Sequence, residues 1–404
     1  MSSFSITTSL NFLPRLVEMI GRRLETMGTI CLPLTSQAFI EKAKRTSGLT
    51  DFGGMEFLEP LDRLLTSFHE EANLNFLGRI AAHHEIAQIL ENRLFLTEER
   101  RINPSIAETP IVSPLFILGL PRTGTTFLHA LLSQDPGVRA PLTWEVMFPS
   151  SRTGSRRRRI TRARRNLAIF SRLSPRFGAI HPTEALLPQE CITLMSHAFL
   201  SDEFDNMFDI PSYSSWLQKQ DLMPAYEWHR RFLQHLQRGM TELWILKAPT
   251  HLASLPSLLE IYPDARFIQT HRAPAEAMRS LTSMTSVLRS TFSDSPFPDP
   301  AGRELIRYWA TNLRKFSRER EQIDPGKICD VQLTEIQRDP MFVAHKIYSH
   351  FGLTLSIEAE KRMRSYLVRN RRKDSAPHWS SKESPHFDPV ESRFFADYSA
   401  RYGV

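Results

Sequence analysis

The feature that most constrains this chain is the segment 116–128, FILGLPRTGTTFL. An apolar run typical of a strand leads to Gly119, four residues separate Gly119 from Gly124, and two threonines open an apolar segment of helical periodicity. A strand, a glycine-rich turn and a helix start bring backbone N–H groups, here those of residues 123–126, and the positive helix end to one point. The segment therefore predicts an anion-binding loop in an α/β fold.

The loop differs from the P-loop of nucleotide-binding proteins at one position. Such loops carry a lysine directly after the second glycine, whereas this chain has Thr125 there and its nearest cation is Arg122. In P-loop enzymes that lysine and a magnesium ion neutralise a phosphoryl group of about two negative charges. No predicted strand clearly ends in a metal-holding aspartate, and we interpret Asp330 as an ordinary strand-end residue.

A sulfuryl group suits this loop better than a phosphoryl group does. It carries one negative charge fewer, so cationic side chains and helix-end amides can stabilise its transfer without a divalent ion. The loop thus favours metal-independent sulfuryl transfer, with a degenerate turn in an unrelated α/β protein as the alternative interpretation.

A second anion site is predicted in RFIQTHRAPAEAMRSLTSM, residues 266–284. Arg272 follows a predicted strand, and Ser280 lies about two turns into the next helix, so both side chains can reach one phosphate. Two anion sites at neighbouring strand ends fit a nucleotide phosphorylated at its 5′ and 3′ positions. The alternative for Arg272 is a surface ion pair.

The order of apolar runs predicts the fold class. Short runs at 115–118, 243–246, 266–270 and 328–333 alternate with helical segments, which is typical of a three-layer α/β fold with a mainly parallel sheet. Residues 1–110 are expected to form a helical N-terminal region packed on an α/β domain of residues 111–404. Within that domain, residues 145–240 form an aromatic-rich helical insertion expected to line the acceptor site.

Composition narrows the class of protein further. A chain of 404 residues with 41% hydrophobic residues can bury a large core, and its net charge of +7 suits anionic small molecules. The three cysteines are far apart, which favours neither disulfides nor a zinc site. No apolar run is long enough to span a membrane and no secretory leader is recognisable, so we expect a cytoplasmic protein.

Arginines are concentrated in residues 151–165, SRTGSRRRRITRARR. Such a run is usually a solvated helix face, and the alternatives are contact with anionic membranes or with acidic acceptors. Nucleic-acid binding is not favoured, because no recognition module with interleaved aromatic residues accompanies the run.

These motifs resemble the family of sulfotransferases that use 3′-phosphoadenosine-5′-phosphosulfate (PAPS), in particular a bacterial branch related to the tyrosylprotein sulfotransferases. The resemblance rests on PLFILGLPRTGTTFLHALLSQDPGVRAPLTWE, LWILKAPTHL, YPDARFIQTHRAPAEAMRSL and the terminal YSARYGV, and it extends from about residue 45 to the end. It implies a P-loop-like α/β fold with PAPS as sulfuryl donor and no metal.

The resemblance also implies roles for particular residues. The loop would hold the 5′-phosphosulfate, Arg272 and Ser280 the 3′-phosphate, and Lys247 the sulfonate and leaving oxygen. Glu145 lies where the tyrosylprotein branch has its catalytic glutamate, whereas His251 loosely resembles the catalytic histidine of cytosolic sulfotransferases. The choice of base between Glu145 and His251 stays open. The predicted donor-binding loop residues are Arg122, Thr123, Gly124, Thr125 and Thr126.

Two segments depart from the family pattern. Leu333 stands where relatives usually have a tyrosine, and the tail segment HWSSKESPHF keeps only His378 and Glu383 of the usual motif. Both departures concern adenine contacts and the role of the tail. We expect sulfuryl transfer to a hydroxyl of a hydrophobic small molecule; the alternatives are a nucleotide-dependent kinase and a non-catalytic nucleotide-binding module.

Overall fold

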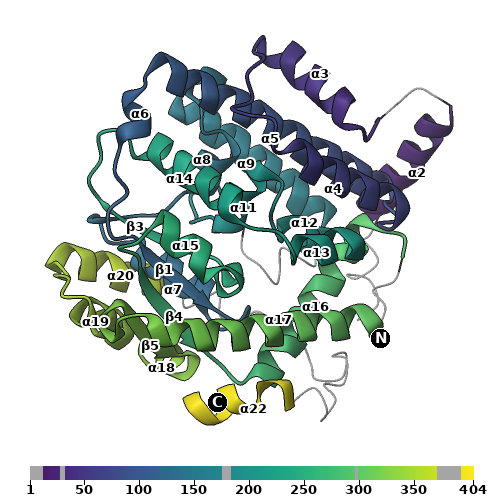
Figure 1. Cartoon of the computed structure of the whole chain (residues 1–404). Helices are drawn as coiled ribbons and strands as arrows, with labels where there is room; N and C mark the ends of the chain where they lie inside the picture. Colours follow the sequence, from purple (N-terminus) through teal and green to yellow (C-terminus); the bar gives the residue numbers. More distant parts are fainter. Residues whose placement is uncertain (1–11, 28–31, 175–182, 296–298, 371–392) are drawn as a thin grey trace, which may run out of the picture.

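The computed structural model describes residues 12–27, 32–174, 183–295, 299–370 and 393–404 (Figure 1). Its centre is a sheet of five parallel strands, which confirms the predicted fold class. In spatial order the strands are β2 (Val138–Arg139), β3 (Leu243–Lys247), β1 (Leu115–Gly119), β4 (Arg266–His271) and β5 (Ile328–Gln332). Four of them match the predicted runs. The two-residue strand β2 was missed, because so short a segment carries no periodicity.

The strand register aligns the carboxyl ends of the strands. Ile117 pairs with Lys247, Gly119 with Thr270, and His271 with Gln332. Residues that follow β1, β3, β4 and β5 therefore meet at one edge of the sheet, where ligands of open parallel sheets bind. The predicted anion loop and Arg272 both lie at this edge.

Side chains alternate between two cores on the two faces of the sheet. Phe116 and Leu118 of β1 enter one core, whereas Leu115 and Ile117 enter the other. The first core contains η3 (Pro249–Ala253), α14 (Met223–Gln237), α15 (Leu255–Ile261), α16 (Pro274–Phe292) and α17 (Asp299–Glu319). The second contains α7 (Thr125–Leu132), α18 (Leu333–Arg338), α19 (Pro340–His350) and α20 (Ile357–Asn370). These layers form the expected three-layer arrangement.

The chain before β1 is helical and continues the first core. Phe68, for example, makes an edge-to-face contact with Phe208 of the insertion at 4.8 Å between ring centroids. In Figure 1 these helices lie above the sheet. They are α2 (Phe12–Thr26), α3 (Ser36–Ser47), α4 (Leu58–Glu70), α5 (Phe76–Ile102) and α6 (Ser105–Glu108). Because one core joins both parts, a domain boundary at residue 110 stays a prediction.

The aromatic residues of the insertion mainly build the core. Phe199, Phe204 and Tyr213 are fully buried, so they do not face an open acceptor pocket; Phe177 lies outside the described residues. The insertion contains η1 (Ser151–Thr153), α8 (Thr143–Met147), α9 (Arg156–Leu173), α11 (Cys191–Met195), η2 (Ser196–Ala198), α12 (Glu203–Met207) and α13 (Pro211–Leu217).

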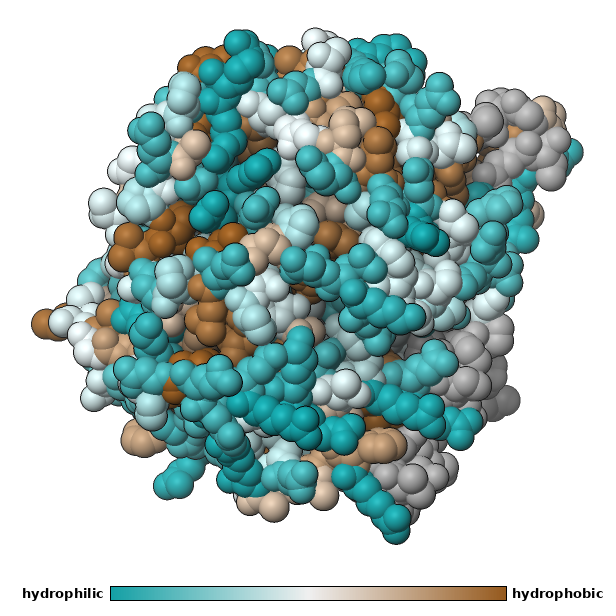
Figure 2. Space-filling model, viewed as in Figure 1, coloured by the Kyte–Doolittle hydropathy of each residue, from teal (hydrophilic) through white to brown (hydrophobic). Residues whose placement is uncertain are grey.

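The described surface is mostly polar. On the face drawn in Figure 2, hydrophilic residues cover most of the area and apolar residues lie in small groups between them. Among the helices that the structure describes, none combines the length and the apolar character needed to cross a bilayer.

Candidate active site

The glycine-rich loop requires both of its glycines. Gly119 has φ +142°, and a Cβ there would lie 2.5 Å from the carbonyl oxygen of Thr270. Gly124 has φ +89° and precedes α7; a Cβ there would lie 2.9 Å from Leu333 Cδ1. Larger residues would be strained at these positive φ values and would also clash. Leu333, the departure from the family pattern, thus packs against the loop itself.

Arg122 is held in the loop in a strained conformation. Its φ is +67°, a left-handed value that costs a residue other than glycine about 1–3 kcal/mol. Its Nε donates to Ser280 Oγ at 3.0 Å. Burial, together with the nearby Arg272 guanidinium, lowers the pKa of Arg122. A strained backbone that supports a half-buried cation beside a second cation is typical of an anion site.

Arg272 lies next to this loop. One of its terminal nitrogens donates to the carbonyl oxygen of Arg122 at 2.9 Å, and its other nitrogens donate to Glu276 at 3.1 and 3.2 Å. Arg122, Arg272 and Ser280 therefore form one contiguous cluster at the ends of β1 and β4. The structure brings the two predicted anion sites together.

The loop threonines have different environments. Thr123 is buried and donates to the Leu120 carbonyl oxygen at 2.6 Å, while its hydroxyl also lies 2.6 Å from that of Thr270. Thr125 is buried at the first turn of α7, whereas Thr126 is exposed. The side chain of Thr123 therefore holds the turn in place, and the Thr126 hydroxyl faces the site.

Lys247 ends β3 beside the loop. Its Nζ donates to Thr126 Oγ1 at 3.2 Å, and its side chain is only 2% exposed. The same Nζ forms an ion pair with Glu190, whose side chain is 22% exposed. Lys247 thus connects the loop to a carboxylate that the sequence analysis did not identify.

The course of the insertion brings Glu190 beside Lys247. Pro188 forms a β-bridge with Leu142, and the Gln189 N–H donates to the Pro141 carbonyl oxygen at 2.7 Å. Glu190 is the next residue and precedes α11. No motif marks it, so only the position of the charge immediately before a buried apolar helix could have signalled it.

Glu145 has a different set of partners from Glu190. Its carboxylate pairs with Arg139 at 3.1 Å and accepts from the Leu142 N–H at 3.2 Å. Arg139 also contacts Met240 Sδ, just before β3 begins, and its guanidinium lies 5.2 Å from the Trp244 ring centroid. Burial raises the pKa of Glu145, and Arg139 opposes this shift. No hydrogen bond or ion pair within the described ranges joins Glu145 to the loop, Lys247 or Arg272.

His251 is enclosed in the core beneath the strand end. Its Nδ1 lies 2.8 Å from the Tyr226 hydroxyl, and its ring packs edge-to-face on Phe116 at 5.0 Å. Its Nε2 is buried and has no hydrogen-bond partner in the described part of the chain. Burial lowers the pKa of His251 well below its ordinary value, as do His229 and Lys247. The ring has no contact with solvent.

The ends of β4 and β5 are tied to the C-terminal helix α22 (Ala396–Tyr402). Asp330 accepts from Arg320 at 2.9 and 3.0 Å and lies 2.8 Å from His271 Nε2, which matches a structural role at a strand end. His271 Nδ1 lies 2.7 Å from the Tyr398 hydroxyl, and its ring stacks on Tyr402 at 4.1 Å. The C-terminal YSARYGV segment, one of the stretches that resembles the family, therefore packs against the end of β4. His378 and Glu383 lie outside the described residues.

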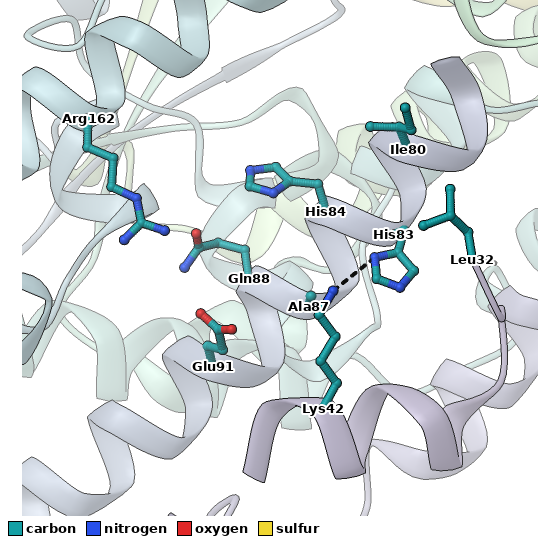
Figure 3. A pocket seen from close by; sticks show the side chains of 9 residues that line it. All are labelled: Leu32, Lys42, Ile80, His83, His84, Ala87, Gln88, Glu91 and Arg162. Carbon is teal, nitrogen blue, oxygen red and sulfur yellow. Dashed lines mark hydrogen bonds between the residues drawn. The ribbon is translucent and has the colours of Figure 1, made fainter. Parts of the chain in front are cut away.

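The structure also contains a pocket outside the glycine-rich loop. A pocket of about 210 Å³ opens between α3, α5 and α9, away from the strand ends (Figure 3). It is lined by Leu32, Lys42, Ile80, His83, His84, Ala87, Gln88, Glu91 and Arg162. The described residues contain no group of three or more histidine, cysteine or acidic side chains that could hold a metal.

This site and fold define a sulfotransferase. The sulfotransferase family model matches residues 114–356, so the chain belongs to that family. It is 27% identical over 343 residues to the omega-hydroxy-beta-dihydromenaquinone-9 sulfotransferase Stf3 of Mycobacterium bovis, covering 79% of this chain and 84% of the relative. The enzyme of the same name from Mycobacterium tuberculosis matches equally well.

Solved structures agree with this assignment. Sulfotransferase STF1 of Mycobacterium tuberculosis superposes with a TM-score of 0.75 at 30% identity, covering 82% of this chain and 93% of that one. Sulfotransferase STF9 of Mycobacterium avium gives a TM-score of 0.77 at 25% identity, with 92% and 97% covered. The resemblance inferred from the sequence is confirmed, and the protein is an enzyme of this class.

Proposed function

We propose that this sulfotransferase moves a sulfuryl group from PAPS to a hydroxyl of a hydrophobic small molecule without a metal ion. The observation that carries the proposal is the cluster of Arg122, Arg272 and Ser280 beside the glycine-rich loop. Arg272 donates to the Arg122 carbonyl oxygen at 2.9 Å, and the ion pair of Arg272 is with a single exposed acid, Glu276. Such a surplus of positive charge suits a ligand with two anionic groups.

The residues present fit the two anionic ends of PAPS. The loop amides of residues 123–126 and the Arg122 side chain would hold the 5′-phosphosulfate, because they converge at the start of α7. Arg272 and Ser280 would hold the 3′-phosphate by charge-assisted and hydroxyl hydrogen bonds. The role of each residue is part of the proposal.

The transfer breaks one bond to sulfur and forms another. The acceptor oxygen bonds to sulfur while the bond between sulfur and the bridging oxygen of the 5′-phosphate breaks, and the hydroxyl proton passes to a base. Lys247, held beside Thr126, would stabilise the charge that develops on the leaving oxygen. Its burial strengthens that interaction, because little water screens it.

We infer that Glu190 is the base. A base must reach the proton it removes, and Glu190 is partly exposed and already contacts Lys247. Glu145 is bound to Arg139 beside the first residues of β3, and His251 has no access to solvent. Their assignments from the sequence stay predictions, and these positions favour Glu190 over both.

The acceptor proposed is apolar and hydroxylated. The name of the mycobacterial relative specifies an omega-hydroxylated menaquinone derivative, which supports this class of acceptor without identifying the molecule for this chain. Cytoplasmic localisation stays a prediction, and so does contact of residues 151–165 with anionic membranes, which concerns a surface separate from the strand-end site.

Calorimetry with nucleotides tests the proposal. Adenosine 3′,5′-bisphosphate should bind about 10–150 times more tightly than AMP in EDTA, which corresponds to about 1.5–3 kcal/mol for a charged hydrogen bond. Equal affinity for the two would remove the role of Arg272 and Ser280. Magnesium-dependent preference for ATP would indicate a kinase. Bisphosphate binding without transfer in a screen of apolar alcohols would indicate a non-catalytic module.

A further inference from the structure

Helix α9 has an extreme charge composition. Its 18 residues, RRRRITRARRNLAIFSRL, include eight arginines and no acidic residue. Four arginines form its first turn, where the positive end of the helix dipole disfavours cations. The helix therefore carries charge that weakens its own start, which is unexpected if the arginines only solvate the surface.

The faces of α9 are sharply divided. Ile160, Ala163 and Leu167 pack with Trp144 and Phe148 in a small separate core. The residues that we call the arginine face lie on the opposite side at helical spacing and are all exposed: Arg158, Arg165, Ile169 and Arg172. Ile169 is 49% exposed in the middle of these cations.

The fold does not neutralise this face. Within the described ranges, no salt bridge involves Arg158, Arg165 or Arg172, whereas Arg139 and Arg272 each have a carboxylate partner. Arg162 lies over the Phe148 ring at 4.3 Å and lines the pocket of Figure 3 together with Lys42. Glu91 lines the same pocket, so Arg162 lies beside a carboxylate and is not counted in the arginine face. Arg158, Arg165 and Arg172 have no carboxylate partner among the described residues.

We propose that the arginine face docks on an anionic lipid bilayer. Clustered arginines are attracted to anionic headgroups, and an apolar side chain among them can enter the interface between headgroups and acyl chains. Single-stranded nucleic acid would instead favour exposed aromatic residues for stacking, and the arginine face has none. This proposal is linked to the proposed function in one way: a bilayer that binds the protein could also supply its apolar acceptor.

Vesicle sedimentation tests the proposal directly. The protein should pellet with vesicles that contain equal parts of phosphatidylglycerol and phosphatidylcholine, and not with phosphatidylcholine alone. The variant Arg158→Glu/Arg165→Glu/Arg172→Glu should bind the anionic vesicles at least about 100-fold more weakly, because each lost cation removes roughly a factor of five. The matched control is Arg307→Glu/Arg314→Glu/Arg318→Glu on α17, with the same charge change on exposed positions, and it should bind more tightly than the first variant.

The outcomes are distinguishable from failure of the proposed function. Nucleotide calorimetry on both variants should be unchanged, so loss of vesicle binding alone supports docking. Equal vesicle affinity of the two variants, or binding to transfer RNA but not to vesicles, would overturn it. If the glutamate variant does not fold, the variant Arg158→Gln/Arg165→Gln/Arg172→Gln is used in the same vesicle assay and should also bind more weakly. Glutamine keeps the helix propensity and removes the charge.

Discussion

Two groups of charged residues beside the parallel sheet use charge in different ways. At the carboxyl edge, Arg122, Lys247 and Arg272 gather around a glycine-rich turn, and one of these arginines has a strained backbone. Beside the first residues of β3, Arg139 and Glu145 form a one-to-one pair that also closes a helix start. The first group holds three cations against two carboxylates, Glu190 and Glu276, and so leaves positive charge available to a ligand. The Arg139–Glu145 pair is balanced and contributes to stability.

Both ion pairs lie along the same strand, β3. The Arg139–Glu145 pair lies beside its first residues, and the Lys247–Glu190 pair is at its last residue. Each carboxylate is therefore held by its own cation, Glu145 by Arg139 and Glu190 by Lys247. The comparison therefore predicts that the two glutamates have separable functions.

The largest expected effect is on turnover. Glu190→Gln should lower turnover by about 10²–10⁴ because glutamine cannot accept the acceptor's proton. Binding of adenosine 3′,5′-bisphosphate should remain. The matched control is Glu145→Gln, measured with the same hydroxyl acceptor, and it should retain most of the turnover. If Glu145→Gln loses turnover with its melting temperature unchanged while Glu190→Gln does not, the assignment from the sequence is right and ours is wrong.

A smaller effect is expected on nucleotide affinity at the same edge. Arg272→Ala should weaken binding of adenosine 3′,5′-bisphosphate by about 1.5–3 kcal/mol, the range for a charged hydrogen bond, and leave AMP affinity nearly unchanged. Calorimetry measures both. Arg279→Ala, an exposed arginine on the same helix, is the control and should bind like the wild type. Parallel losses for both nucleotides would mean that Arg272 supports the loop rather than the 3′-phosphate.

The smallest effect concerns stability and the Arg139–Glu145 pair. Glu145→Gln should lower the free energy of unfolding by about 1–3 kcal/mol, because it leaves the half-buried Arg139 without a charged partner. Urea denaturation checks this. Glu358→Gln breaks an exposed pair with Arg362 and should cost less than about 1 kcal/mol. Equal stabilities of the two variants would show that the Arg139–Glu145 pair is no stronger than a surface pair.

Much of the fold could be predicted from the sequence because its signals are local. Each of the four longer strands is a short apolar run followed by turn residues, and the glycine spacing of the loop reflects positive φ values at Gly119 and Gly124. The cluster of Arg122, Arg272 and Ser280 could be anticipated as well, because parallel strands bring their carboxyl ends to one edge. These inferences need only strand direction and helix spacing.

The sequence by itself thus determined the α/β class, the glycine-rich loop and the cations around it. Only the tertiary structure decided which carboxylate accompanies Lys247, because that depends on how the insertion crosses from Leu142 to Pro188 before Glu190. It also decided that His251 is enclosed, since its surroundings come from α14 and β1 rather than from its own segment. Burial and side-chain pairing arise from contacts between distant segments, which local patterns do not encode.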